Sequence, residues 1–277
     1  MIPSKKSPCF FCFIPLFLSL LILVGCFEVT TTVKVKADGS GTIEETVLLG
    51  EGLATMLKLA ELQKSGVDEK GQFGNPLSLF DEDSLTLRAS KMGTGVRLID
   101  AVPMRRGDRE GYRAMYAFDN VETIRISQTP VPESPGLEDM SSSEPDQEIL
   151  FSFIKGDIRT LLIRMPEAKL SPPGSPAGAD TTAEAAANLE TMHMLIKGLR
   201  FQIAVEVEGT ITETNASHVE GTRVTLMEVD FDKLLADPEQ FQKLKAANPK
   251  TPEETRRLLS TIPGMKVETN RVTRIVF

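Results

Sequence analysis

The chain contains few of the residues that most often carry out chemistry. Among its 277 residues are three cysteines, two histidines, two tyrosines and no tryptophan. Cys9 and Cys12 lie in the N-terminal 25 residues, so a chain that loses this segment keeps only Cys26. A single cysteine excludes an internal disulfide and a thiolate metal site. The lack of tryptophan disfavours a glycan-binding surface, which usually needs exposed aromatic rings.

Basic residues are outnumbered as well. The chain has 31 lysines and arginines against 39 acidic residues, a net charge of −8. Loss of Lys5 and Lys6 with the N-terminal 25 residues would lower the net charge to −10. Such a charge does not favour nucleic acid or bare anionic lipid headgroups as partners. We therefore expect no nucleic-acid partner, and membrane attachment by acyl chains rather than by charge.

Residues 1–25 have the features of an export signal. A positive start precedes an apolar run, Phe10 to Val24, that is too short to be a good membrane-spanning helix. The run ends in the pattern of a bacterial lipobox, Leu23, Val24, Gly25 and Cys26. Small side chains let the backbone lie extended in a peptidase cleft, and the thiol accepts a diacylglycerol. We predict a cleaved signal peptide over 1–25 and a lipidated domain over 26–277.

This prediction also bears on localisation and cofactors. The covalent diacylglycerol and N-acyl chain on Cys26 would hold the protein to membrane lipid, and we expect no other cofactor. Phe27 follows where an aspartate would retain a lipoprotein in the inner membrane. The expected location is the cell envelope: the outer membrane in a host with two membranes, otherwise the outer face of the cytoplasmic membrane.

Alternating and periodic patterns predict many strands and several helices. Strands are expected at 27–36, 42–48, 96–102, 111–118, 149–155, 158–165, 201–208, 210–213, 222–229 and 266–277. Helices are expected at 51–65 and 183–197, and from Asp230, Pro238 and Pro252. Residues 81–92 favour a helix, although the alternation of Leu85, Leu87 and Ala89 leaves a strand as the alternative. Polar stretches at about 128–147 and 166–180 predict flexible insertions. The order predicts an α+β fold, a largely antiparallel, curved sheet with helices packed on one face.

Four short motifs occur in order along the mature chain. They are the start with Cys26 and residues 38–42 (DGSGT), residues 111–119 (GYRAMYAFD), residues 209–216 (GTITETNA) and residues 230–235 (DFDKLL). Together they resemble the LppM-like family of bacterial lipoproteins, whose function is mostly unknown. The resemblance implies a lipid or hydrophobic-ligand role and supplies no catalytic residue.

The aromatic residues of one predicted strand suggest where such a ligand would bind. Tyr112, Tyr116 and Phe118 alternate and so share one face of the strand over 111–118. Met192, on the predicted helix over 183–197, adds a flexible thioether. These four residues form a candidate apolar pocket, and the alternative is that they are packed core.

Candidates for catalysis and metal binding are weak. His193 and His218 are the only histidines, and no Ser-His-Asp arrangement or His-x-x-x-His pair is present. Glu228, Asp230 and Asp232 alternate, but they lack the glycine and bidentate glutamate of a calcium loop and suit a helix start better. We therefore predict no metal site and no enzymatic activity.

Three functions stay open at this point. The first is a non-catalytic envelope lipoprotein that binds a lipid or other hydrophobic ligand. The second is an accessory or scaffold subunit that binds another envelope protein through helices at 238–260. The third is a hydrolytic enzyme, which requires a cleft where a histidine meets a carboxylate.

Overall fold

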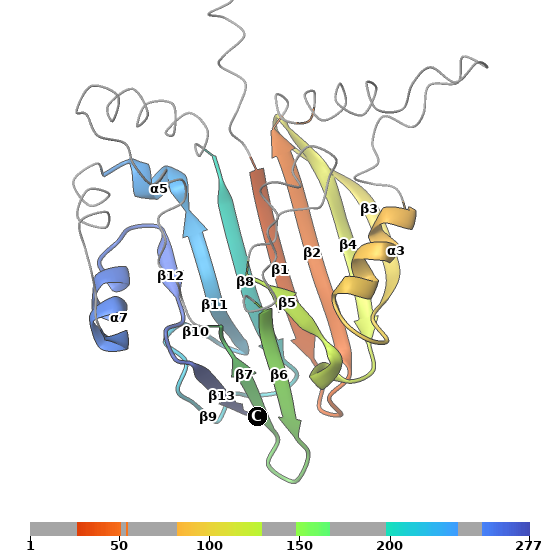
Figure 1. Cartoon of the computed structure of the whole chain (residues 1–277), viewed down its shortest axis with the longest axis vertical. Coiled ribbons are helices and arrows are strands. Elements are labelled where there is room, and N and C mark those ends of the chain that lie inside the picture. The colour runs from red at the N-terminus through yellow and green to blue at the C-terminus, as the bar shows by residue number, and fades with distance from the viewer. Residues whose placement is uncertain (1–26, 51–53, 55–81, 129–147, 167–197, 238–250) are drawn as a thin grey trace, which may run out of the picture.

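The larger of two β-sheets forms the frame of the molecule (Figure 1). The computed structural model describes residues 27–50, 54, 82–128, 148–166, 198–237 and 251–277. The strand order of this sheet is β10 (Val219–Glu220), β11 (Arg223–Asp230), β8 (Arg200–Val207), β1 (Phe27–Val35), β2 (Gly41–Gly50), β4 (Arg109–Phe118) and β3 (Arg97–Arg106), with β12 (Met265–Val267) also paired to β11. Neighbours are antiparallel except β1 and β8, which run parallel. The first strand of the folded domain is therefore a central one.

A second sheet of five strands lies across part of the first. Its strands are all antiparallel, in the order β5 (Arg125–Ser127), β6 (Glu148–Ile154), β7 (Thr160–Arg164), β13 (Val272–Val276) and β9 (Glu213–Thr214). Ile149, Leu161 and Ile275 from this sheet share one buried cluster with Val33 and Ile43 of the larger sheet. The two sheets thus form a sandwich around a common apolar core.

Helices have a smaller part in the described structure. They are α3 (Glu82–Lys91), the 3₁₀ turn η4 (Val121–Thr123), α5 (Phe231–Leu235) and α7 (Pro252–Ser260). Leu85 and Ala89 of α3 reach the common core, so α3 covers the same inner face of the larger sheet as the second sheet does. Leu234, Leu259 and Ile262 form a separate small cluster around α5 and α7.

Several local predictions are confirmed. Asp230 caps α5 by accepting from the backbone amide of Lys233, and Thr251 caps α7 by accepting from that of Glu254. Helix α3 lies within the predicted range 81–92. The predicted hairpin over 149–165 exists as β6 and β7. The predicted strands over 96–102 and 111–118 exist as β3 and β4, but they extend further toward each other than predicted, to Arg106 and from Arg109.

The predicted α+β class, with helices packed on one face of a single sheet, is wrong. The larger sheet faces a second sheet, and the described chain is mostly β. Alternation along a strand predicts that it has a buried face but not which sheet it joins. The helices expected at 51–65 (Ala54 apart), 183–197 and from Pro238 lie outside the described residues.

The prediction of a single final strand over 266–277 is also wrong. It is two strands, β12 in the larger sheet and β13 in the smaller one. Glu268 lies between them, buried, and accepts hydrogen bonds from the backbone amides of Ser217 (2.6 Å) and Asn270 (2.9 Å). A carboxylate that satisfies these amides holds the chain where it crosses from one sheet to the other.

Candidate functional site

The predicted lipidation site lies just ahead of the first strand. Cys26 and the recognition residues Leu23, Val24 and Gly25 fall outside the described residues, and β1 begins at Phe27. Phe27 is buried, pairs with Leu49 of β2, and packs edge-to-face on Phe201 of β8 with ring centroids 5.9 Å apart. A lipid on Cys26 would therefore be joined by one peptide unit to a fixed residue of a central strand.

The predicted apolar pocket on β4 is occupied by packed side chains. Tyr112, Tyr116 and Phe118 are only 2, 0 and 1% exposed and belong to the common core. Met192 lies outside the described residues. The structure thus brings the three aromatic residues together on one face, as their alternation predicts, but in close contact with the core.

A buried ion pair, which sequence reasoning missed, lies beside these aromatic rings. Glu45 of β2 has no exposed surface, and its carboxylate accepts from the guanidinium of Arg88 on α3, with Nε 2.7 and 2.8 Å from the two carboxylate oxygens. The hydroxyl of Tyr112 donates to the same carboxylate at 2.8 Å. Removal of either Glu45 or Arg88 would leave the other as an uncompensated buried charge. The ion pair therefore stabilises the packing of α3 on the sheet. Glu45 lies at an inward-facing position in the alternation of β2, and this position is the one feature of the sequence that could have indicated a buried carboxylate.

Electrostatics in this cluster follow from burial. Burial opposes the charge of Arg88, but the attraction of Glu45 outweighs it, and the pKa of Arg88 is raised. Burial, and then the negative charge of Glu45, raise the pKa of both Tyr112 and Tyr116. Both phenols therefore stay neutral at physiological pH. The hydroxyl of Tyr116 is buried and has no hydrogen-bond partner among the described residues.

A cavity of about 400 Å³ lies elsewhere, between α7, β12 and the turn over residues 215–218. Its walls combine apolar and polar side chains, namely Leu259, Met265, Val267, Ser217, Ser260, His218 and Arg257. The apolar part suits a hydrophobic group, and Arg257 with His218 suits an acidic one. The sequence predicts the start of α7. It does not predict that the final strand divides into β12 and β13, although β12 forms the opposite wall of the cavity.

His218 is thus the predicted candidate that the structure places at a cavity, whereas His193 lies outside the described residues. Its neighbour Ser217 donates its hydroxyl to Glu268 at 3.3 Å. A serine nucleophile would need its hydroxyl on a histidine instead. The geometry at this cavity therefore suits binding better than acyl transfer.

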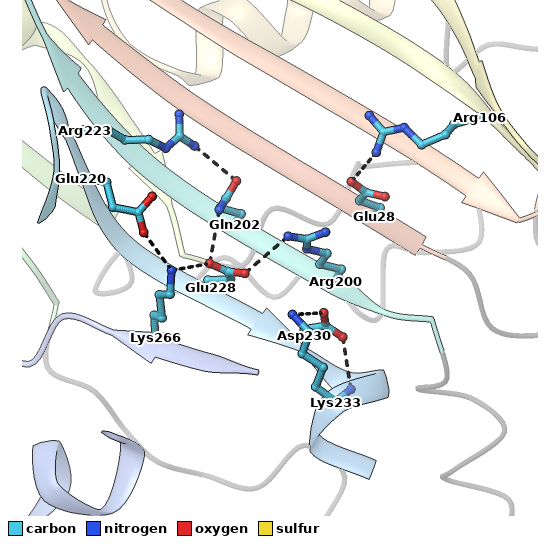
Figure 2. A network of polar contacts seen from close by, with 10 residues as sticks. All are labelled: Glu28, Arg106, Arg200, Gln202, Glu220, Arg223, Glu228, Asp230, Lys233 and Lys266. Carbon is cyan, nitrogen blue, oxygen red and sulfur yellow. Dashed lines mark hydrogen bonds and ion pairs between the residues drawn. The ribbon is translucent and has the colours of Figure 1, made fainter. Parts of the chain in front are cut away.

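The three alternating carboxylates have structural partners. Glu228 contacts Arg200 at 3.4 Å and Lys266 at 3.5 Å (Figure 2). Asp230 caps α5, and Asp232 accepts from the amide of Gly198 at 2.7 Å. Within the described ranges, no group of three or more His, Cys, Asp or Glu side chains is placed to bind a metal ion.

Figure 2 shows that Glu228 is part of a group of polar side chains on the larger sheet. The alternate residues of these strands, such as Val29 and Ile203, belong to the core, so the polar group lies on the opposite face. Attraction by Glu220 and Glu228 outweighs the desolvation of Lys266 and raises its pKa. Glu28 of β1 lies on the same face and pairs with Arg106 at 3.0 Å and Arg109 at 3.1 Å. Glu28 and Glu228 are buried beneath the cations that contact them, whereas Glu220 is exposed.

The part of the chain that the structure describes contains no helix with the length and apolarity needed to span a membrane. Comparisons with protein-family models and with curated proteins find no match. A comparison with solved structures matches the folded domain of LppM from Mycobacterium tuberculosis, with 12% identity and a TM-score of 0.28, over 73% of this chain and 81% of that one. At this TM-score the likeness carries no argument about function.

Proposed function

We propose that the protein is a non-catalytic lipoprotein of the bacterial cell envelope, held to a membrane by acyl chains on Cys26. The observation that carries the proposal is the position of the lipobox. It ends one residue before Phe27, which is buried at the start of the central strand β1. The attachment point therefore has almost no tether, and the sandwich is held against the bilayer surface. Phe27 in place of aspartate supports outer-membrane sorting in a host with two membranes.

The Cys26→Ala variant tests this proposal. Without the thiol, no diacylglycerol can be attached and the leader cannot be removed by a lipoprotein signal peptidase. We expect an unprocessed precursor, longer by the 25 leader residues, that incorporates no labelled palmitate. Ser40→Ala, in the turn between β1 and β2, is the control and should label like the parent. Normal labelling and processing of Cys26→Ala would contradict the proposal.

We further propose that the envelope function is binding of a hydrophobic ligand with an acidic group. The cavity beside α7 supports this, because Leu259, Met265 and Val267 provide its apolar wall and Arg257 provides a cation. The four-residue pocket expected around Tyr112 supports it less, since three of those side chains are packed in the core. The same cavity gives no support to hydrolysis.

Binding of a fluorescent fatty acid tests the ligand proposal. We expect the Arg257→Glu variant to bind it at least about tenfold more weakly, since charge reversal replaces an attraction by a repulsion. Arg113→Glu, at an exposed residue of β4 remote from the cavity, is the matched control and should bind like the parent. Equal affinity of both variants would exclude this cavity, and mass spectrometry of protein purified from its native membrane would then identify co-purified lipids or partner proteins.

A further inference from the structure

The end of the larger sheet from which β1 starts, here called the anchor end, carries the hairpin between β3 and β4 (Figure 1). Phe27 pairs with Leu49, and the next residue of β2, Gly50, pairs with Arg109 at the start of β4. The hairpin is therefore level with Phe27, the residue that follows Cys26 in the sequence. Two to three strand spacings separate them, roughly 10–15 Å. If Cys26 carries lipid, this hairpin reaches the headgroup layer of the same membrane.

Charges at this hairpin are arranged in depth. The side chains of Arg105 and Arg106 are 77 and 56% exposed. The acids that pair with them lie behind: Glu110 is 22% and Glu28 only 8% exposed. The turn itself adds one exposed acid, Asp108. A flat anionic surface at this hairpin would therefore meet two exposed guanidinium groups and one exposed carboxylate, although the chain as a whole is acidic.

The pairing of Glu28 strengthens this asymmetry. Its carboxylate is shared by Arg106 and by Arg109, 3.0 and 3.1 Å away. One arginine suffices to neutralise one carboxylate, so Arg106 can turn toward a phosphate while Arg109 keeps Glu28 paired. Arginine is well suited to such contacts because its planar fork binds phosphate oxygens in pairs.

We propose that Arg105 and Arg106 bind the phosphates of anionic phospholipids and so set the orientation of the domain on its membrane. This rests on the lipid anchor proposed above. The acyl chains supply the affinity, and the hairpin selects one tilt among those that a single attachment point allows. Basic residues near an anionic surface should together favour the contacting orientation by roughly 30-fold at low salt for two arginines.

Site-specific fluorescence on the lipidated full chain tests the proposal. Lipidation blocks Cys26, so one introduced cysteine takes a fluorophore selectively. Asp108→Cys places the fluorophore on the hairpin. Asp157→Cys is its matched control, because it lies in the turn between β6 and β7, at the end of the molecule opposite the anchor end (Figure 1). Each protein is reconstituted in vesicles of phosphatidylcholine alone or mixed equally with phosphatidylglycerol, with a headgroup-level nitroxide lipid as quencher.

We expect strong quenching at position 108 in the mixed vesicles, little at 157, and a fall at 108 when Arg105→Gln and Arg106→Gln are combined or salt is raised. Arg97→Gln, a paired arginine at the other end of β3, should leave the quenching unchanged. Equal quenching at 108 with and without phosphatidylglycerol, or no effect of the double variant, would overturn the proposal. A chain that fails to float with vesicles would instead contradict the lipid anchor.

Discussion

At the scale of single residues, the interior of the sandwich is less apolar than the sequence suggests. The candidate pocket around Tyr112 and Tyr116 was predicted from alternation, which does place both rings on one inward face. Alternation also places Glu45 on the inward face of β2, but no local pattern reveals that Arg88, 43 residues away, pairs with it. Long-range pairing of this kind depends on how α3 packs, which the sequence alone does not specify.

The two tyrosines of β4 make a matched test of this cluster. Tyr112→Phe removes a hydrogen bond to a buried carboxylate and should lower the free energy of unfolding by about 2 kcal/mol. Tyr116→Phe removes a buried hydroxyl that has no partner among the described residues, so stability should be unchanged or rise by up to about 1 kcal/mol. Urea denaturation measures both. Equal destabilisation of the two variants would contradict the assigned roles.

At the scale of elements, the strands and caps were largely predictable and the sheets were not. Thr251 and Asp230 signal helix starts through local hydrogen bonds, and the structure confirms both caps. The division of strands between two sheets depends on contacts far apart in sequence, such as β1 beside β8. The single final strand was predicted because nothing local marks the crossing at Glu268.

Substitution of Glu268 tests whether its carboxylate stabilises the crossing between the two sheets. Glu268→Ala removes a buried carboxylate, leaves the backbone amides of Ser217 and Asn270 without this acceptor, and loosens the crossing between β12 and β13. We expect the free energy of unfolding to fall by about 3 kcal/mol, measured by urea denaturation. Glu220→Ala, an exposed acid paired with Lys266, should change it by less than about 1 kcal/mol. A loss at Glu268 no larger than the loss at Glu220 would show that the crossing needs no carboxylate.

At the scale of the whole molecule, the attachment point and the fold define one direction. Because β1 is central and begins one residue after Cys26, a lipid on Cys26 would turn the anchor end toward the membrane and the turn between β6 and β7 away from it (Figure 1). Chain composition predicts an acidic protein that avoids anionic lipid. Arg106, exposed over the buried Glu28, is a local exception to this acidic surface, and only the folded structure reveals it.

The most direct test of the central claim is the mass of the N-terminal peptide of the protein purified from its native membrane. The lipid-anchor account predicts a peptide that begins at Cys26 and carries a diacylglycerol on sulfur, with or without an N-acyl chain. A mature chain that begins at another residue, or an unmodified Cys26, would contradict it.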